Sequence, residues 1–64
     1  MKFSVPDMSC GHCVASIEKA VKAVDASADV ACDLDTHVVE IGTSAGPETI
    51  TNALRDAGYE ASPL

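Results

Sequence analysis

The chain has 64 residues, enough for one small domain but not for a large enclosed substrate pocket. Hydrophobic residues make up 47% of it and aromatic residues only 3%, so we expect an aliphatic core and no aromatic platform for nucleic-acid bases. The formal charge of −6 repels phosphate backbones and anionic lipids, which argues against nucleic acid as a partner. No apolar run approaches the roughly 20 residues of a membrane helix. The first residues also lack the pattern of a secretory signal peptide, a basic region followed by an apolar run and a cleavage site. We therefore expect a cytoplasmic protein that does not insert into membranes.

The first half of the chain shows a strand pattern, a helix pattern and two more strand patterns. Alternating apolar residues predict strands at residues 2–5, 29–35 and 37–42. Residues 13–24 carry apolar side chains at helical spacing and predict an amphipathic helix. The side chains expected to face the core from the helix and from the second strand are Val14, Ile17, Val21, Val24, Val30, Cys32 and Leu34.

The second half repeats a helix and a strand. Gly46 and Pro47 indicate a helix start, because proline suits the first helical position, and Gly58 indicates its end. Residues 59–64 then predict a weak edge strand that tolerates Pro63. This order, βαββαβ, predicts an α+β ferredoxin-like sandwich in which two helices cover one face of a four-stranded antiparallel sheet. We expect residues 1–64 to form a single domain.

Two cysteines lie at the start of the first predicted helix, in the stretch MSCGHC. Cys10 is expected in the loop and Cys13 in the first helical turn, with Ser9 as a candidate cap. Unpaired N–H groups and the helix dipole favour negative charge there, so both thiols should ionise readily. In a reducing cytoplasm, an odd number of cysteines argues against a disulfide framework. Thiolates at this spacing suit either metal binding or disulfide exchange.

The surrounding chain favours metal binding. A disulfide-exchange enzyme of the thioredoxin type would need a longer chain, an aromatic residue before Cys10 and a proline in a loop facing the thiols. Two thiolates suffice for the soft ion Cu(I), whereas Zn(II) usually demands four ligands. We therefore expect a metal-binding protein without enzymatic activity.

The Met8, Cys10, Cys13 signature and the Ala57, Gly58, Tyr59 turn, in this element order, resemble the heavy-metal-associated domain, and in a chain of this size a bacterial copper chaperone. The resemblance implies that Cys10 and Cys13 hold Cu(I) and pass it by thiolate ligand exchange to the metal-binding domain of a copper-transporting P-type ATPase. A copper-bridged homodimer is a further implied state.

One departure keeps other readings open. Asp7 stands where the family usually has glycine, so a module for Zn(II), Cd(II) or Hg(II), or a domain cut from a transporter, is the alternative. Zinc-exporting relatives typically carry an acidic residue directly before the first cysteine, and Ser9 at that position favours copper. A thiol redox protein is the third reading.

Several other residues have expected roles around the cysteines. Met8 is expected to anchor the loop in the core. His12 is expected to be a solvated side chain, with occasional ligation or contact with a second copy as the alternative. Tyr59 is expected near the loop, where the family has a residue that tunes the site, with a place in the core as the alternative. Cys32 is expected to be an inert buried residue and His37 to lie at the sheet edge, distant from the site and without a function. Lys19 and Lys22 on the exposed helix face are candidates for partner docking.

Overall fold

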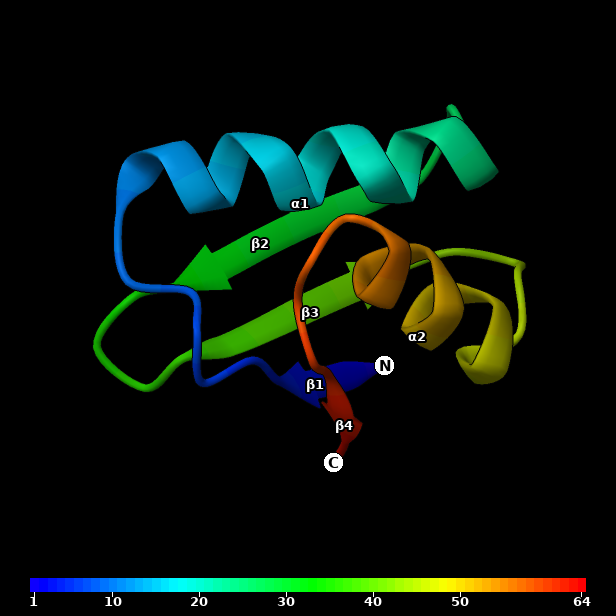
Figure 1. Cartoon of the computed structure of the whole chain (residues 1–64). Helices are drawn as coiled ribbons and strands as arrows, with labels where there is room; N and C mark the ends of the chain where they lie inside the picture. Colours follow the sequence, from blue (N-terminus) through cyan, green and yellow to red (C-terminus); the bar gives the residue numbers. More distant parts are fainter.

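The computed structural model describes all 64 residues and contains six elements in the expected order. The sheet has the strand order β2-β3-β1-β4, every pairing is antiparallel, and both helices lie on one face (Figure 1). This confirms the predicted α+β ferredoxin-like fold. The elements are β1 (Lys2–Ser4), α1 (Gly11–Val24), β2 (Asp29–Asp33), β3 (Val38–Gly42), α2 (Pro47–Asp56) and β4 (Ser62–Pro63).

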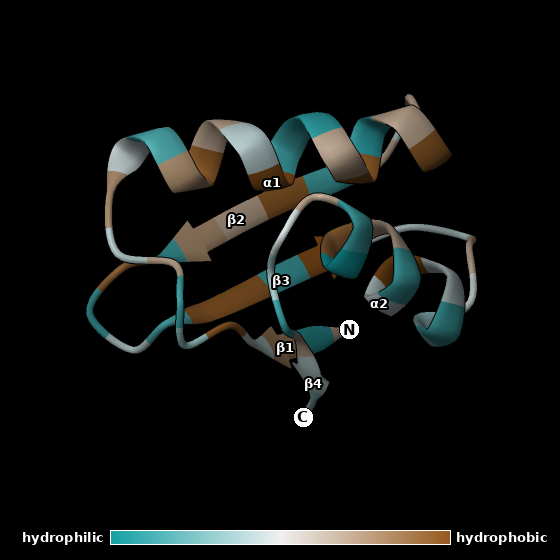
Figure 2. Ribbon diagram, in the orientation of Figure 1, coloured by the Kyte–Doolittle hydropathy of each residue, from teal (hydrophilic) through white to brown (hydrophobic).

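The core lies between the sheet and the two helices. Strand alternation turns Phe3 and Val39, which are register partners, toward the helices. Brown segments of α1 in Figure 2 face the sheet, as expected for an amphipathic helix. No polar or charged residue is buried, so the core between the two layers is entirely apolar. The buried residues are Phe3, Val5, Met8, Ile17, Val21, Ala28, Val39, Ile41, Ile50 and Leu54.

The second strand is shorter than its alternating pattern predicts. Leu34 was expected to face the core, but it lies beyond the end of β2 and is 39% exposed. Asp33 explains this ending, because its Oδ1 accepts hydrogen bonds from the backbone N–H groups of Asp35 (2.9 Å) and Thr36 (3.3 Å). An aspartate that bonds the backbone two residues on starts a turn. Val24, the last residue of α1, is likewise 39% exposed instead of buried.

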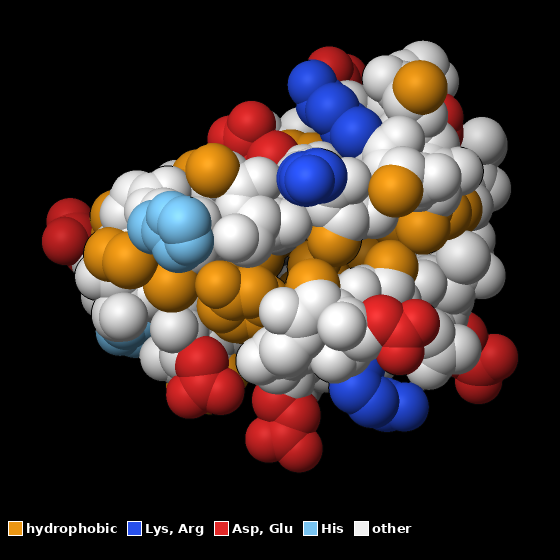
Figure 3. Space-filling model, turned by 45° about the horizontal axis from the view of Figure 1, so that its top comes forward, with side chains coloured by type: hydrophobic (Ala, Val, Ile, Leu, Met, Phe, Trp, Pro, Cys, Tyr) orange, Lys and Arg blue, Asp and Glu red, His pale blue; other side chains and the backbone are white.

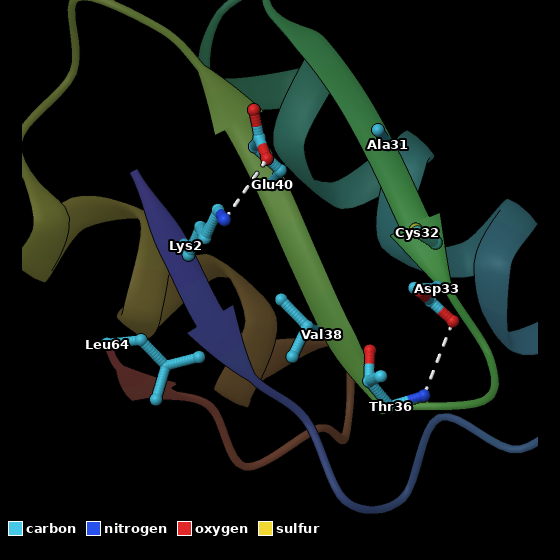
Figure 4. Close-up of a pocket in the computed structure, with 8 residues that line it drawn as sticks. All are labelled: Lys2, Ala31, Cys32, Asp33, Thr36, Val38, Glu40 and Leu64. Atoms are coloured by element: carbon cyan, nitrogen blue, oxygen red, sulfur yellow. Dashed lines mark hydrogen bonds and ion pairs between the residues drawn. The ribbon is translucent and has the colours of Figure 1, made fainter.

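The face of the sheet away from the helices carries a shallow hollow of about 410 Å³ (Figure 4). Lys2 and Glu40 form an ion pair of 3.8 Å there, but both side chains are mostly exposed, so it adds little stability. Neither Cys10 nor Cys13 lines this hollow. Its lining residues are Lys2, Ala31, Cys32, Asp33, Thr36, Val38, Glu40 and Leu64.

Both ends of the chain are tied to the sheet on the side away from α1 (Figure 1). The terminal amine of Met1 donates to the carbonyl oxygen of Ile41 at 2.9 Å. The backbone N–H of Leu64 donates to the carbonyl oxygen of Lys2 at 2.8 Å. Neither helix has the length and apolar character that crossing a lipid bilayer would require.

Candidate metal site

The two cysteines follow a loop whose base is fixed in the core. This cysteine loop, residues 5–10, connects β1 to α1. The backbone N–H of Met8 donates to the carbonyl oxygen of Val5 at 3.0 Å, which closes a turn around Pro6 and Asp7. The side chain of Met8 is fully buried among the core residues. The exposed residues Pro6 and Asp7 therefore stand between two buried ones, and Met8 is the last buried residue before Cys10.

Cys10 and Cys13 place their sulfur atoms side by side at the start of α1. Cys10 is the N-cap residue and is exposed, while Cys13 lies in the first turn and is half-buried. Their Sγ atoms are 3.4 Å apart, well beyond the roughly 2.05 Å of a disulfide bond, and both are free thiols. Ser9 is not the cap that the sequence suggested, because the chain stays extended for one more residue.

The start of α1 has no built-in negative charge. Cys10 makes no side-chain capping hydrogen bond, and the first turn contains no acidic residue. The unpaired backbone N–H groups and the positive end of the helix dipole therefore act on whatever lies in front of the helix. Cys10 and Cys13 lie at this helix start, so negative charge on the sulfur of Cys13 is favoured there.

The pKa of Cys13 is lowered from 9.0 to about 7. A hydrogen bond from the Tyr59 hydroxyl is the largest cause, followed by the backbone of Ser9 and the side chain of Cys10, and partial burial opposes them. Cys13 therefore ionises more readily near neutral pH than an ordinary cysteine does. The Cys13 sulfur also lies 3.9 Å from the carbonyl oxygen of Asp7, which ties it loosely to the loop.

Tyr59 reaches the cysteines from the far end of the sequence. Gly58, with φ of 96°, turns the chain after α2, and the backbone N–H of Tyr59 donates to the carbonyl oxygen of Leu54 at 2.9 Å. The pKa of Tyr59 is raised, first because its hydroxyl donates to Cys13. Ser16, one turn beyond Cys13, hydrogen-bonds the same hydroxyl and opposes that rise. Sequence reasoning missed Ser16, which looked like an ordinary polar residue on an exposed helix face.

The other candidate residues make no hydrogen bond to the thiols. His12 is exposed on the first turn of α1, and Lys19 and Lys22 are exposed farther along that helix. Cys32 is half-buried in β2 against the core, and burial raises the pKa of its thiol. No group of three or more histidine, cysteine or acidic side chains is arranged to hold a metal ion. The arrangement is a two-sulfur set and not a four-ligand cage.

The predicted position of His37 was wrong. It lies in the turn between β2 and β3, next to the cysteine loop and not distant from it. Its Nδ1 is 2.8 Å from the carbonyl oxygen of Met8, and its own carbonyl oxygen accepts the backbone N–H of Val5 at 2.7 Å. These contacts join residues about 30 positions apart in the sequence, which local patterns do not reveal.

The surface around the start of α1 is mixed in character. In the space-filling view, histidine and hydrophobic side chains, a class that includes cysteine, lie together at this end of the molecule (Figure 3). Acidic side chains are spread around the rim of the same face (Figure 3). This end of the face is therefore partly apolar and is bordered by acidic side chains (Figure 3).

The sequence and fold match those of known proteins. The family model of the heavy-metal-associated domain matches residues 2–60. The COP-associated protein of Helicobacter felis is 41% identical, over 94% of this chain and 97% of its own length. The copper-exporting P-type ATPase of Vibrio cholerae is 37% identical over 100% of this chain, which spans only 7% of that ATPase.

Two solved structures have the same fold as this chain. The copper chaperone Atx1 of Synechocystis PCC6803 superposes with a TM-score of 0.95 at 35% identity, covering 97% of this chain and 98% of that one. A gold binding protein superposes with a TM-score of 0.92 at 38% identity, covering 95% and 94%. By sequence and by fold, the chain belongs to the heavy-metal-associated domain family.

Proposed function

We propose that this protein is a cytoplasmic Cu(I) carrier that holds the ion between Cys10 and Cys13 and hands it to the metal-binding domain of a copper-transporting P-type ATPase. The observation that carries the proposal is the exposed sulfur pair, 3.4 Å apart, at a helix start with no third metal-ligating side chain. Carriage of an ion needs no catalytic group, and we propose none.

The donor set suits a soft monovalent ion. Cu(I) is satisfied by two thiolates, whereas structural Zn(II) sites take four protein ligands. With a pKa of about 7, Cys13 supplies a thiolate near neutral pH without help from the metal. The helix start offsets the negative charge that remains on a complex of one Cu(I) and two thiolates.

Release of the ion depends on a difference between the two sulfur atoms: Cys10 lies at the end of the loop and Cys13 lies in the helix. A metal–thiolate bond is about 2.3 Å long in zinc sites, so a near-linear bridge of similar bonds holds two sulfurs farther apart than 3.4 Å. Cys10, at the end of the loop, can move outward more easily than Cys13 in the helix. A thiolate of the partner then bonds to Cu(I) and the bond from Cys10 breaks. A second thiolate of the partner next bonds to Cu(I) as the bond from Cys13 breaks, and no electron is transferred.

Three relationships support copper and an ATPase partner. The Helicobacter and Synechocystis relatives cover nearly the whole chain, and the match to a copper-exporting ATPase lies in a segment of this chain's size. Donor and acceptor domains of one fold can present matching cysteine pairs to each other. Lys19 and Lys22, exposed on α1, can steer a negatively charged partner, since they are two of only four cations.

The likeness to a gold binding protein favours a second candidate cargo, Au(I). Au(I), like Cu(I), is a soft monovalent ion that accepts two thiolates. The same geometry therefore serves both ions, and only their relative affinity and supply decide which one is carried.

The deciding experiment is an anaerobic competition titration of the reduced protein against a chromogenic Cu(I) chelator, with Zn(II) and Au(I) titrated in parallel. We expect tight uptake of one Cu(I) per chain, or per two chains if copper bridges a homodimer. A double variant, Cys10→Ser with Cys13→Ser, should lose this uptake, and Cys32→Ala should keep it. Copper left with the chelator, together with tight Zn(II) binding, would overturn the copper assignment.

Delivery is tested separately with the isolated metal-binding domain of a copper-transporting ATPase as acceptor. We expect Cu(I) to appear on the acceptor faster than it dissociates to the chelator alone, because ligand exchange avoids free copper. A transfer rate that is independent of acceptor concentration would show release to solvent and would contradict direct handover.

A further inference from the structure

We propose that His37 is a positioning residue for the metal site: its imidazole fixes the carbonyl of Met8 and thereby holds the base of the cysteine loop while Cys10 moves. This inference rests on the proposed function, because it assigns His37 a part in holding the same ion. It begins from two contacts between the β2–β3 turn and the cysteine loop.

Met8 is held at three points. Its side chain is buried in the core, its N–H donates to the carbonyl of Val5, and its carbonyl oxygen lies 2.8 Å from Nδ1 of His37. A carbonyl oxygen only accepts hydrogen bonds, so Nδ1 of His37 carries the hydrogen in this contact. Beyond this anchor, only Ser9 separates Met8 from Cys10, so the position of the first sulfur depends directly on how firmly Met8 is held.

The turn that presents His37 is itself ordered. Asp33 accepts hydrogen bonds from the backbone of Asp35 and Thr36, and Figure 4 shows the bond to Thr36. The carbonyl oxygen of His37 accepts the N–H of Val5 at 2.7 Å. Two hydrogen bonds therefore join the turn to the loop, one through the backbone of His37 and one through its imidazole. The half-buried imidazole therefore contacts the loop from a rigid support.

The backbone at His37 makes its identity informative. With φ of 58°, the position lies in the left-handed region, which glycine adopts freely and asparagine tolerates well. Turn stability alone favours those residues over histidine. The imidazole is the one part of His37 that reaches Met8, so the side chain is the evident reason for the residue.

The test compares three variants in the full chain. His37→Gly keeps the left-handed backbone and removes the imidazole. His37→Asn keeps the backbone preference and restores a donor, because the amide nitrogen of asparagine occupies about the place of Nδ1. Asp33→Ala loosens the same turn without touching Met8. Each variant is measured for Cu(I) affinity, for the rate of Cu(I) loss to a chelator, for amide exchange of residues 9–11 without metal, and for urea stability.

We expect His37→Gly to lower Cu(I) affinity about three- to tenfold, the factor that one ordinary hydrogen bond represents, mainly through faster loss of the ion. Amide exchange of residues 9–11 should accelerate, while urea stability stays level or rises. His37→Asn should recover most of the affinity. Asp33→Ala should lower stability more than it lowers affinity.

Three results would overturn the inference: unchanged affinity and exchange in His37→Gly, no recovery in His37→Asn, or an affinity loss in Asp33→Ala as large as that in His37→Gly. Failure of the proposed function is visible separately, as absence of Cu(I) binding by the unmodified protein. In that case the amide exchange of residues 9–11 still decides whether His37 holds the loop.

Discussion

The two helices of this protein begin in opposite electrostatic settings, although the two halves of the fold repeat the same strand and helix order. Helix α1 begins after its N-cap residue Cys10, which makes no side-chain capping hydrogen bond, and its first turn has no acidic residue. Helix α2 begins behind Gly46, with Pro47 at its first position and Glu48 in its first turn. Proline removes one unpaired N–H group, and the glutamate offsets the helix dipole.

The difference shows what the metal site requires of the fold. At the start of α2, the carboxylate of Glu48 already offsets the positive end of the helix dipole, and no binding role is assigned to this site. The start of α1 lacks such compensation, and the negative charge of the Cys13 thiolate supplies it. A substitution that stabilises a helix start should therefore be harmless at α2 and damaging to metal binding at α1.

The largest expected effect is the loss of a sulfur at the start of α1. We expect Cys10→Ser to lower Cu(I) affinity by more than about 100-fold, the upper end of the loss that follows mutation of an outer-shell partner of a metal site. Because Cys10 is exposed, the free energy of unfolding of the metal-free protein should hardly change. Chelator competition and urea unfolding of the same sample check both statements. Retained affinity would remove Cys10 from the site.

The next effect concerns the hydroxyl that lowers the pKa of Cys13. In Tyr59→Phe that pKa should rise from about 7 toward 9.0, and Cu(I) affinity at pH 7 should fall up to about tenfold, within the range of outer-shell partners. The sign follows from proton competition: the thiolate that is present above pH 7 in the unmodified protein forms only at higher pH in the variant. The alkylation rate of Cys13 between pH 6 and 9 measures the shift, and an unmoved profile would contradict it.

A smaller effect is expected when α1 is given the charge of α2. His12→Glu places a carboxylate at the second helical position, as Glu48 does in α2. We expect α1 to gain about 0.3–1 kcal/mol from the dipole interaction, while the pKa of Cys13 rises and Cu(I) affinity falls a few-fold. His12→Gln is the matched neutral control. A loss of affinity in both variants would instead indicate a direct role for the imidazole.

The reciprocal change at α2 should affect stability alone. We expect Glu48→Gln to lower the free energy of unfolding by about 0.3–1 kcal/mol through the lost dipole interaction, with Cu(I) affinity unchanged. Urea unfolding and chelator competition measure the two quantities. An altered copper affinity would mean that the two helix starts are coupled, contrary to the comparison.

The smallest expected effect is a gain of stability at Gly46. The backbone there is extended, with φ of −72° and ψ of 156°, and an added Cβ meets no atom within 4 Å. We expect Gly46→Ser to add a few tenths of a kcal/mol by capping α2, because serine is a slightly better N-cap than glycine. Thermal unfolding detects the gain, and a lower midpoint would show that the added hydroxyl disturbs the cap.

The sequence predicted the order of elements well, because periodicity and turn residues are local signals. Alternation placed the strands, and Gly46, Pro47 and Gly58 marked the ends of α2. The same signals gave a wrong boundary where the alternating pattern continued beyond the end of the strand. Leu34 continues the alternation of β2, but the hydrogen bonds of Asp33 turn the chain before it.

The candidate site was only partly readable from the sequence. The spacing of Cys10 and Cys13 places one thiol at the cap and the other in the first turn of the same helix, so their proximity follows from local geometry. Tyr59 was expected near the loop through the family resemblance and not from any pattern of its own. His37 was missed because its contact with Met8 spans 29 positions and depends on the register of two strands.

The anchoring of both chain ends has a practical consequence. Met1 and Leu64 are tied to the sheet on the side away from α1, so a tether joined to either end would leave the cysteines unobstructed. The protein could be immobilised or labelled with a fluorophore through either end. Several copies could also be joined by linkers, and the cysteines of each copy would remain accessible to its neighbours. Copper relayed along such a string would then be limited by the reach of the linkers and not by access to the site.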